Sequence, residues 1–313
     1  MRLAAALTVL AVTTAARAEE GGAGHYAPGA FASFADVLPA QPGFVTFNYF
    51  TYYDGNGSLH HQFPIAGQLA LKLGTTYCVD TVGAFWVTPL RVLGANFALG
   101  LSLPFMKTSI TMSMTHPAGE TVGRSGSASG LGDIEFWPVA LSWGAMGGDL
   151  HVEFLGGIYA PSGGYEANRL ANPGLGYWTF EPGVLVSYLG QKSGFEFTTY
   201  VGYDINSANH ATDYRGGQEF HVDATVARHL ALGKGLIGIG ANAFYLKQTT
   251  PDSGGGAVLG SFEEMTSGIG PVLSYATQLK KVGLVAELKW LPQLSAEKTP
   301  KGDYVWLKVG VQF

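Results

Sequence analysis

The sequence predicts an all-β protein, a transmembrane antiparallel β-barrel of about 12 strands with an N-terminal plug segment. Three observations lead to this prediction. The last residues, DYVWLKVGVQF, alternate two kinds of side chain up to the terminal Phe313, which is the period of a strand with two different faces. Only 13% of the 313 residues are charged, about half the share usual in soluble domains. The mature chain has no run of about 18 apolar residues, so spanning helices are not expected.

The N-terminus has the features of a secretory signal. Arg2 precedes an apolar run, and Ala16-Arg17-Ala18 places small residues at the two positions that signal peptidase reads. We therefore expect a signal peptide at residues 1–18. Together with the C-terminal strand, it predicts location in the cell outer membrane of a Gram-negative bacterium.

Residues 19–43 are expected to form a plug or a periplasmic leader. Their apolar side chains recur at helix-like spacing between prolines, which predicts one short helix or turn, too short to be stable alone in water. The barrel interior is the nearest surface on which it could pack, through His25, Tyr26, Phe31 and Phe34. A flexible leader is the alternative, because small residues and prolines also suit a tether.

Residues 44–313 are expected to form the outer-membrane β-barrel. Segments of period two bounded by Gly, Pro, Asn and Asp predict strands near 44–53, 66–87, 93–114, 131–143, 149–160, 177–189, 194–205, 219–231, 236–249, 264–277, 282–291 and 303–313. Long polar loops are expected at 54–64, 115–130, 161–176, 206–218, 250–263 and 292–302. They alternate with short turns, which in such barrels are periplasmic, so both termini are expected in the periplasm.

The same alternation assigns side chains to the lumen. The charged residues expected to face inward include Glu181, Asp223, Glu287, Lys289 and Lys308. The aromatic residues expected to face inward are Trp137, Tyr200, Phe244 and Trp306. Opposite charges on neighbouring strands would stabilise the wall whether or not anything is transported. Inward aromatic rings, in contrast, favour an apolar ligand.

The sequence does not predict an enzyme, a cofactor or a metal site. None of the eight histidines has Ser two residues later, the spacing that a barrel phospholipase would use. His221 and Asp223 share a strand face, as an outer-membrane protease would require, but a hydrogen bond in a polar lumen explains the pair equally. His60 and His61 are adjacent, so their side chains point apart on an extended chain. No basic cluster points to nucleic acid.

Nine short motifs, which follow one another through nearly the whole mature chain, carry a resemblance. They are GAGHYAPGAFASF (22–34), VLGANFALG (92–100), GLGDI (130–134), RLANPGLGYWTFEP (169–182), ATDYRGG (211–217), DSGGGA (252–257), GIGPVLSYA (268–276), LVAELKWLP (284–292) and GDYVWLK (302–308). In this order they resemble the outer-membrane transporter family of the phenol meta-cleavage degradation pathway. The resemblance implies a barrel that takes up small hydrophobic compounds, by analogy with fatty-acid channels whose N-terminal segment plugs the lumen. It carries over no binding residues.

We therefore expect a monomeric outer-membrane channel for diffusion of small hydrophobic or aromatic compounds into the periplasm. Its expected partners are outer-membrane lipid, a small apolar ligand, and the barrel assembly machinery, which would recognise Phe313. A structural or adhesion barrel with a sealed lumen is the main alternative, and an outer-membrane hydrolase is a weaker one. An inward aromatic path would favour the channel, and a lumen closed by salt bridges would favour the sealed barrel.

Overall fold

The computed structural model describes residues 24–57, 63–65, 68–70, 72–115, 121–257 and 263–313. The expected signal peptide at 1–18 and the pair His60-His61 lie outside these residues. In the described part of the chain, the helical elements are two 3-10 turns, η1 (Phe34–Asp36) and η2 (Met146–Gly148). No helix among the described residues is long and apolar enough to cross a membrane.

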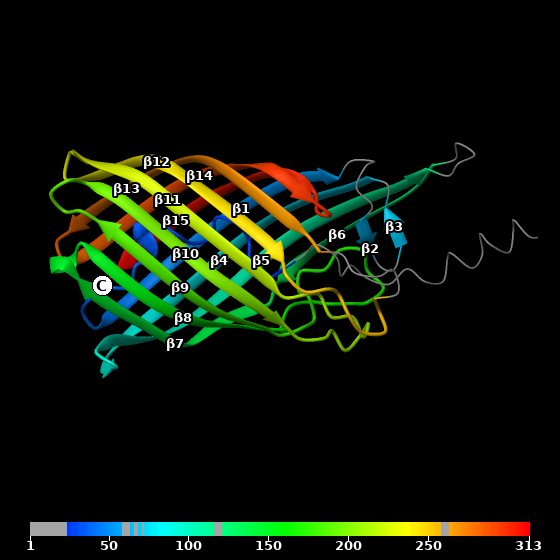
Figure 1. Ribbon diagram of the computed structural model, residues 1–313, viewed down its shortest axis with the longest axis horizontal. Coiled ribbons are helices and arrows are strands. Elements are labelled where there is room, and N and C mark those ends of the chain that lie inside the picture. Colours follow the sequence, from blue (N-terminus) through cyan, green and yellow to red (C-terminus); the bar gives the residue numbers. More distant parts are fainter. Residues whose placement is uncertain (1–23, 58–62, 66–67, 71, 116–120, 258–262) are drawn as a thin grey trace, which may run out of the picture.

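One antiparallel sheet closes on itself to form the molecule (Figure 1). Its strands, within the described residues, are β1 (Gly43–Gly57), β4 (Lys72–Val92), β5 (Ala95–Thr115), β6 (Thr121–Leu131), β7 (Ile134–Ala145), β8 (Leu150–Ala160), β9 (Thr179–Leu189), β10 (Phe195–Asn206), β11 (Glu219–Leu232), β12 (Gly235–Gln248), β13 (Met265–Leu279), β14 (Val282–Glu297) and β15 (Lys301–Gln312). The short strands β2 (Phe63–Ile65) and β3 (Gln68–Ala70) pair with each other and, among the described residues, form a separate two-stranded sheet.

The barrel has twelve wall positions, as expected from the sequence. Strand β1 pairs with both β4 and β15, and β4 pairs with β5, which closes the circle. Strands β6 and β7 share one wall position, because both pair with β5. Strand β7 pairs with the first part of β5, Asn96 to Ser102, and β6 pairs with the rest, Phe105 to Thr115. The closed all-β antiparallel barrel of twelve strands is therefore confirmed.

Two of the expected loops are largely strand. The range 115–130 contains β6, and the range 292–302 is mostly taken up by the ends of β14 and β15, which leave three residues between them. Both predictions were wrong for the same reason. These strand parts carry Gly, Ser and charged residues instead of alternating apolar ones, because they do not have one face in lipid and the other in a packed core.

The outer surface of the wall is apolar. Phe197, Ile239 and Leu273 are exposed by 42%, 56% and 46%, whereas the preceding residue on β10, Glu196, is buried. Such alternation gives the apolar band by which a barrel contacts lipid tails. Further exposed aromatic side chains lie near the two rims, as expected for interfacial girdles: Tyr52, Trp178 and Trp290 at one rim, and Tyr275 and Phe313 at the other.

The two ends of the barrel differ in their connections (Figure 1). At the end that holds the C-terminus, strands are joined by short turns, such as Leu93-Gly94 between β4 and β5. Both residues have positive φ, 50° and 78°, the backbone of the tight turn that matches strand twist. Longer connections, such as 161–178 and 207–218, lie at the opposite end. We call these the turn end and the loop end, and the loop end faces outward in barrels of this kind.

Candidate functional site

The N-terminal segment, residues 24–42, runs lengthwise through the barrel interior. At the loop end, the His25 ring lies 2.8 Å from the Thr179 hydroxyl and 3.0 Å from an Asp133 carboxylate oxygen. At the turn end the segment continues into β1, whose first residue Gly43 lies against the backbone of Phe313. The described residues of the segment therefore span the length of the lumen. The expected periplasmic N-terminus falls on residues outside the described range.

Three carboxylates of the inner wall hold the backbone of the segment. The Gly29 amide donates to both Asp223 oxygens at 3.1 and 3.2 Å. The amides of Phe34 and Leu38 donate to Glu196 and Glu153, each at 2.8 Å. A loop backbone in a barrel lumen has no ladder of its own, so buried amides need such side-chain acceptors. The inward carboxylates thus supply the acceptors that these three amides do not find in the backbone of the segment.

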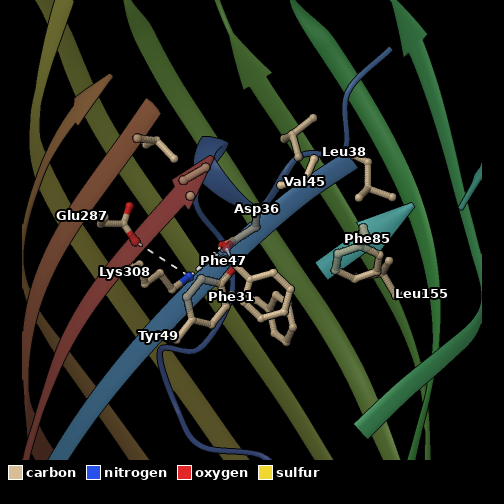
Figure 2. Close-up of a pocket in the computed structure, with 14 residues that line it drawn as sticks. Phe31, Asp36, Leu38, Val45, Phe47, Tyr49, Phe85, Leu155, Glu287 and Lys308 are labelled. Atoms are coloured by element: carbon tan, nitrogen blue, oxygen red, sulfur yellow. Dashed lines mark hydrogen bonds and ion pairs between the residues drawn. The ribbon is translucent and has the colours of Figure 1, made fainter. Parts of the chain in front are cut away.

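A second set of contacts comes from the last two strands (Figure 2). Lys308 donates to both Asp36 oxygens and lies 3.8 Å from Glu287, which is 3.3 Å from Lys289. The Lys289 ammonium donates to the carbonyl oxygens of Gly29 and Phe31, both at 3.0 Å. Glu287 and Lys308 are register partners on β14 and β15, so the cross-strand pairing expected from the sequence is present. Asp36 of the N-terminal segment adds a further carboxylate to this pairing, because it accepts from Lys308 inside the lumen.

The apolar side of the segment packs on inward aromatic rings. Phe31 lies 4.7 Å from Tyr200 between ring centroids, and Phe34 meets the edge of His229 at the same distance. Trp137 and Tyr200 belong to the buried cluster that includes Tyr26 and Phe31. The short turn expected between the prolines is the 3-10 helix η1, with Ser33 as its capping residue.

A cavity of about 290 Å³ lies between the segment and the loop end. Its wall includes Trp137, Trp306 and a set of tyrosines, namely Tyr49, Tyr53, Tyr77, Tyr159 and Tyr304. Apolar side chains of β4 and β5 complete it, among them Val79, Met106 and Ile110. Trp306 also donates to the Pro28 carbonyl at 3.0 Å. The cavity therefore combines aromatic and aliphatic side chains with threonine hydroxyls and the carboxyl groups of Asp133, Glu135 and Glu264, and it ends on the N-terminal segment.

The four aromatic residues expected to meet a ligand are all buried in the interior, but they divide into two groups. Trp137 and Trp306 line the cavity directly. Tyr200 is turned away from it, against Phe31 and the Glu181 carboxylate, to which its hydroxyl donates at 2.6 Å. Phe244 supports the cavity from behind, edge-on to Tyr304 at 5.8 Å. The structure thus brings together two of the four.

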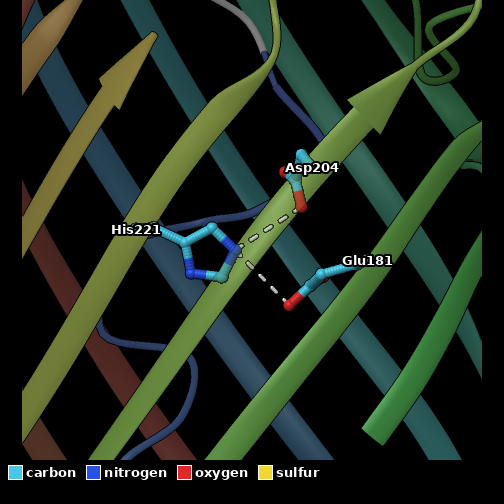
Figure 3. Close-up of side chains that lie close together, drawn as sticks. All are labelled: Glu181, Asp204 and His221. Atoms are coloured by element: carbon cyan, nitrogen blue, oxygen red, sulfur yellow. Dashed lines mark ion pairs between the residues drawn. The ribbon is translucent and has the colours of Figure 1, made fainter. Parts of the chain in front are cut away.

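The charged residues expected in the lumen are buried, with Glu181, Asp223, Glu287 and Lys308 each at 2% exposure or less. Asp223 accepts a hydrogen bond from Tyr26 in addition to the Gly29 amide. It is therefore held by the N-terminal segment, through a hydroxyl and a backbone amide. His221 lies instead beside Glu181 and Asp204 (Figure 3). Asp204 was not singled out in the sequence, because its partners are on other strands.

An apolar outer band, a closed antiparallel wall and a filled polar interior define an outer-membrane β-barrel. The chain belongs to the family described as "Putative MetA-pathway of phenol degradation", whose profile matches residues 61–309. The resemblance seen in the motifs is therefore confirmed.

The chain is also similar to solved structures. An outer membrane channel from Pseudomonas putida F1 superposes with a TM-score of 0.61 and 14% identity, covering 92% of this chain and all of that one. The β domain of the Bordetella autotransporter Brka gives a TM-score of 0.49 at 11% identity, covering 87% and 99% of the two chains. The first similarity establishes a shared fold. No curated protein matches the sequence.

Proposed function

We propose that this barrel is an outer-membrane channel through which small hydrophobic or aromatic compounds diffuse toward the periplasm, with residues 24–42 as its plug. The cavity above the N-terminal segment, into which Trp137, Trp306 and several tyrosines face, is the observation that carries the proposal. The family description, which refers to phenol degradation, and the fold shared with a Pseudomonas putida channel support it.

The size of the cavity fits a small aromatic ligand. An apolar cavity of about 150 Å³ is enough to hold benzene in another protein, and this one measures about 290 Å³. One or two rings therefore fit without rearrangement of the wall. Each ring stacked on Trp137 or Trp306 would gain about 0.5–1.5 kcal/mol beyond the burial of its area. The hydroxyl oxygens of Tyr49, Tyr53 and Tyr159 can accept a hydrogen bond from a phenolic group, since their own protons are donated to Asp36, Gln293 and Glu181.

The segment below the cavity must shift before a ligand reaches the turn end. It is held by hydrogen bonds from its backbone to Asp223, Glu196 and Glu153 and by the ion pair with Lys308. A hydrogen bond to a charged group adds about 1.5–3 kcal/mol, so breaking the contacts one at a time costs less than breaking the whole set, which keeps the resting lumen filled. The channel is therefore closed to large polar solutes and yields locally to a small apolar one.

A structural or adhesion barrel with a sealed lumen is the second candidate, and the buried ion pairs around Lys308 and Lys289 favour it. Uptake separates the two functions. Cells that express the protein should take up phenol or toluene faster than cells that lack it, under conditions where the outer membrane limits entry. Equal rates would rule out the channel and leave the sealed barrel as the better explanation.

A further inference from the structure

Three side chains from three adjacent strands converge in the outer half of the lumen: Glu181 of β9, Asp204 of β10 and His221 of β11 (Figure 3). The His221 Nε2 atom lies 3.4 Å from Asp204 Oδ1 and 3.5 Å from Glu181 Oε1. All three offered atoms lie within 4.8 Å of one another. We propose that this cluster binds a divalent transition-metal ion, and we take Zn²⁺ as the representative ion.

The spacing of the atoms fits a shared ion better than direct hydrogen bonds. In a tetrahedral zinc site with bonds of about 2.1 Å, neighbouring ligand atoms are about 3.4 Å apart. The two distances from His221 match this separation. Neither ring nitrogen of His221 and neither oxygen of Asp204 has a hydrogen bond among the described residues. Buried polar atoms seldom remain in this state, and an ion between them would satisfy the atoms that face it.

The charge of the cluster points the same way. His221 and Asp204 are fully buried, and Glu181 is 1% exposed. When both carboxyl groups are deprotonated, they carry a charge of −2 beside a neutral imidazole, and a divalent cation neutralises it. The lysines of the lumen do not supply this charge, because Lys289 and Lys308 pair with Glu287 and Asp36. Imidazole with carboxylates selects a first-row transition ion over Mg²⁺ or Ca²⁺, which prefer oxygen ligands throughout.

The surroundings hold the three ligands in place. Tyr200 and Tyr159 donate to the two oxygens of Glu181, at 2.6 and 3.1 Å, as outer hydrogen-bond partners do in metal sites. Gly202 lies opposite His221 on β10, where a Cβ atom would come within 2.2 Å of the imidazole Cε1. The imidazole therefore needs a residue without a side chain at this position.

The N-terminal segment covers the cluster. The Tyr26 ring stacks on the His221 ring at 3.6 Å between centroids, and its hydroxyl donates to Asp223. A bound ion would fix the orientation of His221 and so the surface on which Tyr26 packs. The bound ion would join the wall to the outer part of the segment. The site adjoins the cavity of the proposed transport, because Tyr26 and Tyr159 also line that cavity.

The test is metal content and Zn²⁺ binding of the untagged, detergent-purified full-length mature barrel. We expect about one tightly held ion per barrel, or uptake of one Zn²⁺ after chelation. Co²⁺ should give the visible absorption of a tetrahedral site. His221→Gln and Asp204→Asn should each lose this ion. His229→Gln is the matched control, because His229 is a buried histidine on the same strand whose Nε2 bonds one carboxylate, Glu196, at 2.6 Å; this variant should keep the ion.

Heat-modifiable gel mobility reports folding of each variant. If one of the two site variants does not fold, the other variant still tests the proposal. Zn²⁺ titration of the wild-type protein after chelation tests it independently of both. Absence of Zn²⁺ binding by the folded wild-type barrel would overturn the proposal, and the carboxyl groups would then be held by shared protons. Retention of the ion in folded His221→Gln or Asp204→Asn would also overturn it, since the ion would lie elsewhere.

Discussion

Lys308 and Asp36 form a buried ion pair although 272 residues separate them, with both carboxylate oxygens accepting from the ammonium at 2.8 and 3.0 Å. The pair joins the last strand to the N-terminal segment. It is completed by Glu287, 3.8 Å from the same ammonium (Figure 2). The strength of this contact should therefore control how firmly the segment stays in the lumen.

Lys308→Met should loosen the segment and raise the single-channel conductance in planar bilayers. The substitution leaves Asp36 buried without its cation, which costs about 3–5 kcal/mol when one partner of such a pair is removed. Lys301→Met, on the same strand but exposed at the loop end, is the matched control and should not change conductance. Equal conductance of the two variants would show that the ion pair does not retain the segment.

Deletion of residues 22–40 should open the lumen. Removal of the chain that fills it leaves a polar interior that water can enter, so conductance should rise well above that of Lys308→Met. Gel mobility before and after heating should show that the barrel still forms. A folded deletion variant with unchanged conductance would mean that these residues do not obstruct the lumen.

Trp306→Ala should slow uptake of phenol or toluene at limiting concentration by about two- to tenfold, the loss expected for one ring contact. Phe244→Ala should have a smaller effect, because Phe244 supports the cavity through Tyr304 and does not line it. Phe197→Ala, whose ring faces outward, is the control. Uptake of sugars and amino acids should stay as it is. Equal uptake by Trp306→Ala and wild type would show that the Trp306 ring does not contact the transported compound.

Deletion of Phe313 should impair assembly in the outer membrane. Its amide closes the β1 edge through the Phe44 carbonyl at 3.0 Å, while its ring is 64% exposed and free to be recognised. Phe313→Tyr keeps an aromatic terminus and should assemble normally. The readouts are membrane yield and heat-modifiable mobility. Normal values for the deletion would show that the assembly machinery does not require this residue.

Stability should fall as the pH rises through neutrality, because of Glu264, which lies just before β13 at the loop end. Burial, with the charge of Asp252, raises the pKa of this carboxyl to about 7, against a hydrogen bond from Thr299. Because the folded protein holds this proton more tightly than the unfolded chain does, the protonated carboxyl adds to the free energy of unfolding. This contribution, on the order of 1–3 kcal/mol, is complete below the ordinary pKa of Glu and is lost as the pH rises to about 7.

Glu264→Gln should therefore flatten this dependence, seen as the unfolding temperature of the detergent-solubilised barrel between about pH 5.5 and 8.5. Glu263→Gln is the control, because Glu263 is the exposed neighbour of the buried group. If Glu264→Gln and wild type respond equally to pH, the carboxyl does not titrate in this range.

The wall could be predicted from the sequence because lipid and lumen impose opposite requirements on alternate residues. Phe197 and Glu196 obey this rule, and the alternation predicts the bounds of their strand, β10, to within one residue. Strand β6, with the sequence TVGRSGSASGL, does not. It continues the barrel beyond the apolar band, where backbone hydrogen bonds to β5 are enough to hold a strand of small polar residues.

The contacts inside the lumen could be predicted only in part. The alternation of side chains along a strand predicts that His221 and Asp223 share one face. It does not predict that Tyr26 donates to Asp223, or that His221 lies beside Asp204 and Glu181. Such partners are fixed by the shear of the barrel and by the path of the N-terminal segment. Neither is encoded in a local pattern.

Lys289 and Lys308, which bind the N-terminal segment, lie on the last two strands of the chain, β14 and β15. Strand β15 also closes the barrel by pairing with β1. A chain that has paired only its earlier strands therefore has no cation for Asp36 and none for the carbonyl oxygens of Gly29 and Phe31. In the folded barrel, β14 and β15 supply these cations, and β15 also completes the sheet by pairing with β1. The strands that close the wall are therefore the same strands that hold the segment inside it.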